Sequence, residues 1–297
     1  MSLLKRRIFL CLIGICAGLG AWSVAEMILC FQVDFPSYLV FTLSLGGVFG
    51  GIMGGFFGSS DGIIMSNKYR IRTGIIHGIL FGALGGVLGF LTGQAVLFIA
   101  GEYLLHSMKE FNRIGLPVSR ALGWSLLGLF AGVAEGIRAR SVEKIRVGII
   151  GGLSGGLLGG LALEYARIIF PDIMLARLTG LLILGVCIGI MYGFAEARLS
   201  FGVFTLLNGR YKGKDFLVNQ RRLDVGDSDS CDIVLKGYRE VNPMHAKVHV
   251  KKDEVFIKSS GDGRAPLFVN DDKISSHRLK IGDVIKIGTA KLLYHYK

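Results

Sequence analysis

Three acidic residues in apolar surroundings are the first side chains whose spacing could support chemistry. Asp61, Glu135 and Glu196 each follow a pair of glycines that lie four residues apart, and each acid comes three residues after the second glycine. Acids within membrane segments usually face the bundle interior and often mark ion or proton paths. Two interpretations stay open: these acids line a cation or proton path, or they are interfacial groups that pair with arginines of the loops.

Glu26 and Glu164 lie nearer the outer face of the membrane and present the same two interpretations. The sequence shows no motif for other kinds of chemistry. The five cysteines show no metal or disulfide spacing, and the chain has no Gly-x4-Gly-Lys loop, His-Glu-x2-His helix or Gly-x-Ser-x-Gly elbow. We therefore predict a protein that is not an enzyme and that holds no metal ion or cofactor.

The acids must be positioned by membrane helices, because six stretches are apolar over the twenty or so residues that a bilayer requires. Lysine and arginine are concentrated before the first stretch and in alternate connections, which indicates that both termini are cytoplasmic. We expect a multi-pass protein of the inner (plasma) membrane. The predicted spans are residues 8–31, 38–60, 74–101, 120–137, 147–169 and 177–197.

Glycine forms rows along these spans and accounts for 44 of the 297 residues. Glycine recurs at every fourth residue from Gly74 to Gly86 and again from Gly148 to Gly160. Rows of this kind leave a smooth helix face on which a second backbone can pack closely. We predict a tight bundle of three repeated Gly-rich hairpins. The same faces could join protomers into a homo-oligomer, and membrane lipid is the other expected neighbour.

The last third of the chain differs in composition and periodicity. Residues 1–200 are mostly apolar, whereas residues 201–297 have an ordinary soluble composition, with short alternating strands separated by turn sequences. Many short strands within about a hundred residues predict an antiparallel sandwich. The predicted strands are residues 203–207, 215–218, 222–225, 232–235, 246–250, 255–258, 267–269, 284–287 and 291–296. The predicted domains are therefore a six-span transmembrane domain at 1–200 and a cytoplasmic β-sandwich at 201–297.

Residues 206–296 resemble a forkhead-associated (FHA) domain, a family that reads phosphothreonine peptides. The matching pieces run in order through the whole segment: Leu207-Asn-Gly, Leu223-Asp-Val-Gly226, Cys231-Asp-Ile-Val-Leu235, Val241-Asn-Pro-Met-His245-Ala246, Phe268-Val-Asn270 and Leu279-Lys-Ile-Gly-Asp283. The resemblance implies an FHA-like sandwich in which Gly226 and His245 are structural.

The departures from the family lie at its binding positions. Asp227 stands where the family usually has an arginine, and Asn242 stands where it has a serine. A phosphothreonine carries nearly two negative charges and favours bidentate arginine, so a carboxylate at Asp227 would repel it. Lys236, Arg239 and Arg264 are basic residues of neighbouring loops that could restore a positive rim.

Three roles for this segment stay open: phosphothreonine binding, binding of a non-phosphorylated cytoplasmic protein through the same loops, and a purely structural role. Nucleic acid is not expected, because the lysines are spread over strands without interleaved aromatic residues. We predict a non-catalytic membrane protein that anchors or scaffolds a cytoplasmic partner in a signalling or secretion assembly. The alternative is a small channel or transporter that is regulated by its FHA-like domain.

Overall fold

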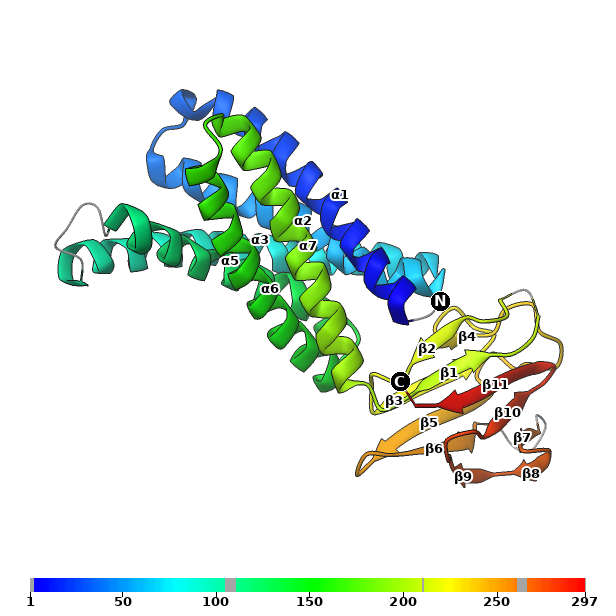
Figure 1. Ribbon diagram of the computed structural model, residues 1–297. Coiled ribbons are helices and arrows are strands. Elements are labelled where there is room, and N and C mark those ends of the chain that lie inside the picture. The colour runs from blue at the N-terminus through cyan, green and yellow to red at the C-terminus, as the bar shows by residue number, and fades with distance from the viewer. Residues whose placement is uncertain (1–2, 105–110, 210, 261–265, 297) are drawn as a thin grey trace. The chain divides into compact units, whose positions relative to one another are not determined.

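A computed structural model describes residues 3–104, 111–209, 211–260 and 266–296 (Figure 1). The chain forms two compact units. The helical unit comprises Arg7–Ile63 and Arg70–Ala195, and the sandwich unit comprises Met1–Arg6, Ile64–Tyr69 and Glu196–Lys297.

All six predicted spans are helices, each long and apolar enough to cross a membrane. Each helix extends beyond the predicted span at one end or both, because charged residues such as Arg6, Lys68 and Glu143 are part of the helix ends. The prediction of six apolar helices is confirmed. Their bounds are α1 (Leu3–Cys30), α2 (Tyr38–Met65), α3 (Lys68–Ile99), α5 (Leu116–Arg138), α6 (Val142–Ile169) and α7 (Ile173–Leu199).

Glycine contacts pair α2 with α3 so closely that the two backbones touch. A Cβ atom added to Gly54 would overlap the carbonyl oxygen of Gly78, and one added to Gly50 would overlap that of Gly82. Side chains at these positions would force the helices apart, and the close van der Waals contact between backbones would be lost.

Two further helix pairs pack in the same way. In α5 and α6, a Cβ atom on Gly128 would overlap the carbonyl of Gly152. The third pair joins the first and last helices, because a Cβ atom on Gly14 would overlap the carbonyl of Gly185 (Figure 1). This third pair is closed by the two ends of the helical sequence. Glycine also meets glycine between α3 and α5, where a Cβ atom on Gly89 would overlap the carbonyl oxygen of Gly123. Descent of the three pairs from one ancestral hairpin stays a prediction.

The sandwich unit contains two β-sheets. One has the strand order β2-β1-β11-β10-β7-β8 and the other β4-β3-β5-β6-β9. The recorded strand pairings are antiparallel apart from the short parallel pair of β3 with β4. The bounds are β1 (Val203–Leu206), β2 (Asp215–Leu217), β3 (Arg222–Gly226), β4 (Ile233–Val234), β5 (Ala246–Lys251), β6 (Glu254–Ser259), β7 (Leu267–Val269), β8 (Asp272–Ile274), β9 (Ser276–Arg278), β10 (Val284–Ile287) and β11 (Ala290–His295).

The core of the sandwich follows the alternation of the sequence. In β5, Ala246, Val248 and Val250 are buried while the residues between them are partly exposed. They pack in one cluster with residues such as Phe204 and Ile285 of the other sheet. Burial of one face of each sheet explains why the strands could be predicted from period-two patterns.

Candidate binding loops and buried charge clusters

The loop after β3 and the loop before β5 are held together by backbone hydrogen bonds. The Asp227 N–H donates to the Asn242 carbonyl at 3.0 Å, and the Ser228 N–H donates to the Pro243 carbonyl at 3.2 Å. A Cβ atom at Gly226 would overlap the Pro243 carbonyl oxygen, so this close approach requires glycine. Gly226 thus fixes how the two loops meet.

His245 joins the same loop to the residue before β7. Its ring is buried, and its Nδ1 atom accepts a hydrogen bond from the Asn242 N–H at 3.2 Å. Its Nε2 atom lies 3.4 Å from the Pro266 carbonyl, which assigns the neutral tautomer with the proton on Nε2. Burial lowers the pKa of His245, although the Pro266 carbonyl acts in the opposite direction. His245 therefore has a structural role, because it links Asn242 in the β4–β5 loop to Pro266 before β7.

The side chains of Asp227 and Asn242 are half-buried. Within the described part of the chain, neither side chain has a hydrogen-bond or ion-pair partner. A carboxylate and an amide are therefore available here to a binding partner, and none of the cationic side chains that the structure describes is paired with the carboxylate. This arrangement suits N–H donors or a basic group and opposes a phosphate.

Lys236 and Arg239 line a separate hollow of about 650 Å³. The Arg239 N–H donates to Thr289 Oγ1 at 3.0 Å, and the exposed Lys236 ammonium lies 3.2 Å from Asp229. The rest of the wall comes from three loops that are distant in the sequence, and Tyr211, Gly237, Tyr238 and Thr289 were not predicted as binding residues. The lining residues are Asn208, Gly209, Tyr211, Gly237, Tyr238 and Thr289. Of the five predicted binding residues, Lys236 and Arg239 line this hollow, Asp227 and Asn242 do not, and Arg264 lies outside the described residues.

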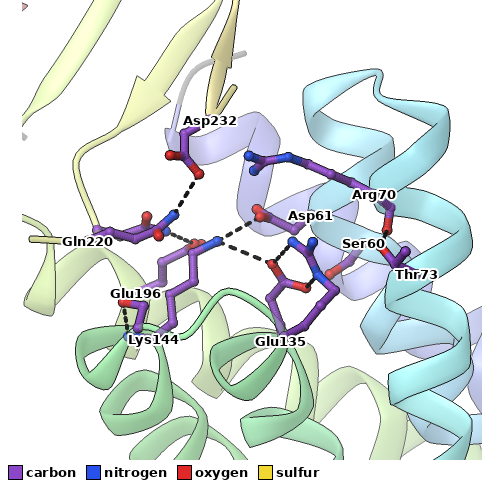
Figure 2. A network of polar contacts seen from close by, with 12 residues as sticks. Ser60, Asp61, Arg70, Thr73, Glu135, Lys144, Glu196, Gln220 and Asp232 are labelled. Atoms are coloured by element: carbon purple, nitrogen blue, oxygen red, sulfur yellow. Dashed lines mark hydrogen bonds and ion pairs between the residues drawn. The ribbon is translucent and has the colours of Figure 1, made fainter. Parts of the chain in front are cut away.

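Near the α5–α6 turn, the helical unit contains a buried charge cluster built around Lys144. The Lys144 ammonium lies 2.8 Å from Asp61 Oδ2 and 3.3 Å from Glu135 Oε1 (Figure 2). Arg138 Nε donates to the other oxygen of Glu135 at 2.7 Å. Asp61 and Lys144 are 4% and 3% exposed, so neither charge is solvated by bulk water. Each charge depends on its partners for stabilisation.

Glu196 forms an equivalent pair in the sandwich unit. Arg6 donates to both of its carboxylate oxygens at 2.6 Å, and Asn219 Nδ2 adds a bond of 2.9 Å. Arg6 precedes Gly14 by the same number of residues as Lys144 precedes Gly152. The pairs therefore occupy equivalent places in the glycine pattern.

Glu26 and Glu164, near the C-terminal ends of α1 and α6, also have basic partners. Arg177 forms a bidentate pair with Glu26 at 2.7 and 2.8 Å. Glu164 is almost fully buried and accepts from Arg120 at 3.1 Å and Arg167 at 3.3 Å. All five predicted intramembrane acids are therefore engaged by at least one lysine or arginine.

Comparison with known proteins identifies the sandwich. Residues 205–297 match the family model Yop-YscD_cpl, described as "Inner membrane component of T3SS, cytoplasmic domain". The helices before residue 205 lie outside this match. No curated protein matches the chain.

Several solved FHA domains are similar to the same part of the chain. One from Chlamydia trachomatis is 24% identical, with a TM-score of 0.30, and the match covers 32% of this chain and 97% of that one. One from Arabidopsis thaliana is 18% identical, with a TM-score of 0.30 and coverages of 33% and 87%. The N-terminal FHA domain of Rad53p from S. cerevisiae, solved with a phosphothreonine peptide, is 13% identical, with a TM-score of 0.29 and coverages of 32% and 93%.

The family match and the two-sheet sandwich coincide with the segment whose sequence resembles an FHA domain. The chain thus combines six apolar, membrane-length helices with a C-terminal, FHA-like sandwich.

Proposed function

We propose that this protein is a membrane-anchored, non-catalytic interaction protein of an inner-membrane secretion assembly. The observation that carries the proposal is the match of residues 205–297 to the cytoplasmic domain of a T3SS inner-membrane component, in a chain with six apolar helices. In this function the helices hold the sandwich at the membrane, and the sandwich recruits a cytoplasmic protein.

The partner surface is assigned to the loop end that contains Asp227 and Asn242. A partner that is not phosphorylated fits this end best, because the Asp227 carboxylate has no cation to offset its repulsion of phosphate within the described residues. Lys236 and Arg239 extend the surface along the neighbouring hollow.

The channel alternative receives less support from the charge clusters. An ion path needs carboxylates that can exchange ligands, whereas Asp61, Glu135 and Glu196 are all engaged by buried basic side chains. Proteoliposomes of the full chain are therefore expected to show no cation or proton flux. Flux that is abolished by Glu135→Gln and Glu196→Gln would instead support transport.

The topology that this function needs has both termini in the cytoplasm. A reporter active only in the cytoplasm is expected to work after Lys297 or within residues 62–72 and to fail within residues 106–116. A working fusion at 106–116 together with an inactive one after Lys297 would contradict the topology.

Photocrosslinking in intact membranes tests the partner surface directly. A photoreactive amino acid replaces Asn242 in the full chain. In the matched control it replaces Lys252, an exposed residue directly after β5, at the opposite end of this strand from His245. We expect one protein to be captured from position 242 and not from 252, with or without phosphatase treatment. Capture that phosphatase abolishes would favour phosphothreonine recognition, and equal capture at both positions would oppose this surface.

A further inference from the structure

A cavity of about 450 Å³ lies within the helical unit. It is formed near the ends of α1, α3 and α6 and the starts of α2, α5 and α7. Its volume lies in the range of about 300–1,000 Å³ that is usual for small-ligand sites. Most of its wall is apolar, and its aromatic part consists of Tyr38, Phe41, Phe49, Phe90 and Trp124.

Charged groups gather on one part of the cavity wall. Arg120, Arg167, Arg177 and Glu164 all line it. Glu164 is shared by Arg120, Arg167 and the indole N–H of Trp124, while Arg177 is paired with Glu26. Among the described residues, two carboxylates thus pair with three guanidinium groups, which leaves one positive charge in excess.

The two arginines that share Glu164 have unused donors. Each guanidinium carries five N–H donors, yet within the described residues Arg120 and Arg167 each bond through Nη1 alone. Their side chains are 42% and 35% exposed, so the remaining donors are accessible. An unneutralised cation near the hydrocarbon region is costly, and an anion would complete the site.

The excess charge is also unexpected for this end of the bundle. The lysines and arginines that set the orientation lie in the other set of connections, so this end is the one that should be poor in positive charge. A cationic group beside an aromatic, apolar wall matches a ligand with one anionic end and one hydrocarbon end.

We propose that this cavity binds one anionic phospholipid. Its phosphate is held by Arg120 and Arg167, and an acyl chain lies along the wall formed by Phe41, Phe49 and Phe90. Trp124 lies in the same wall, so its fluorescence reports an acyl chain that enters the cavity.

The test uses the full chain reconstituted in nanodiscs, with Trp22→Phe so that Trp124 is the single tryptophan. Phosphatidylglycerol with brominated acyl chains should quench Trp124 more strongly than brominated phosphatidylcholine at the same mole fraction. Loss of one charge-assisted contact should lower the preference for phosphatidylglycerol about tenfold in Arg120→Gln and in Arg167→Gln. Arg113→Gln is the control, because Arg113 is exposed near the same helix ends and does not line the cavity.

Equal quenching by the two lipids, or an unchanged preference in both glutamine variants, would overturn the proposal. Displacement of the brominated phosphatidylglycerol by inorganic phosphate would identify a free-anion site instead and would also overturn it. If the glutamine variants do not fold, native mass spectrometry of the unaltered protein decides, because it should retain phosphatidylglycerol and release phosphatidylcholine. Release of both lipids would contradict a specific phospholipid site in this cavity.

Discussion

Two adjacent glycines of α2 provide a sharp test of the backbone contact between helices. A Cβ atom on Gly50 would overlap the carbonyl oxygen of Gly82 and lie 2.9 Å from the Cα atom of Gly86. A Cβ atom on Gly51 would find its nearest neighbour, an atom of Ile79, at an ordinary 3.7 Å. Both residues are buried in the same helix, so the two alanine variants differ mainly in the atoms that the added methyl group would contact.

The expected magnitude follows from this difference. Replacing glycine by alanine within a helix favours the helix by about 0.8–1.0 kcal/mol at either position. At Gly50 the added methyl group meets backbone atoms that cannot rotate away, so overpacking of about 1–3 kcal/mol opposes this gain. Because the propensity term is common to both variants, Gly50→Ala should be less stable than Gly51→Ala by about 1–3 kcal/mol.

The assay is reversible unfolding of the purified full chain in mild detergent, with added sodium dodecyl sulfate as the denaturant and helix content as the signal. Gly51→Ala should unfold at the same or a higher denaturant fraction than the unaltered protein, and Gly50→Ala at a lower one. Equal midpoints for the two variants would refute the inference that α2 and α3 touch through their backbones at this site.

Three further predictions follow from the charge cluster and the sandwich. Lys144→Met should cost about 3 kcal/mol of unfolding free energy because it leaves buried carboxylates short of a cation, and exposed Lys68→Met should change it by less than about 0.5 kcal/mol in the same assay. Burial lowers the pKa of His245 in the folded state, so the stability of the sandwich should be full above about pH 6.5 and fall as the pH drops below it; His245→Gln should flatten this slope in urea titrations. Joint Asp227→Arg and Asn242→Ser should create phosphothreonine-dependent binding, measured by calorimetry against a threonine-phosphopeptide library, with each charged hydrogen bond contributing about 1.5–3 kcal/mol.

Strong periodicity made most of the fold predictable. All six spans and nine strands lie where apolar runs or alternation indicated them. The two strands that the sequence did not reveal, β8 and β9, are three residues long and mostly exposed. Polar residues such as Asp272 and Ser276 carry no burial pattern, so only their pairing with β7 and β6 defines them as strands.

The sites were less accessible to prediction because their residues are far apart in the sequence. The acids could be found from glycine spacing, but their partners required the packing: Lys144 reaches Asp61 across 83 residues. Likewise, Thr289 carries no signal of its own and meets Arg239 only because the turn between β10 and β11 lies beside the β4–β5 loop. Spacing reveals repeated local patterns, whereas contacts between distant loops depend on the fold.

The packing of the first helix on the last has a consequence for how the protein is made. Glu26 meets Arg177 across 151 residues, a length that a ribosome needs roughly eight to thirty seconds to synthesise. During that interval α1 is already in the membrane, and neither its glycine face nor its carboxylate has the native partner. The nascent chain therefore passes through a stage in which α1 is exposed to lipid, the insertion machinery or membrane proteases. Helix pairs α2–α3 and α5–α6 avoid this delay, because each closes as soon as its second helix emerges.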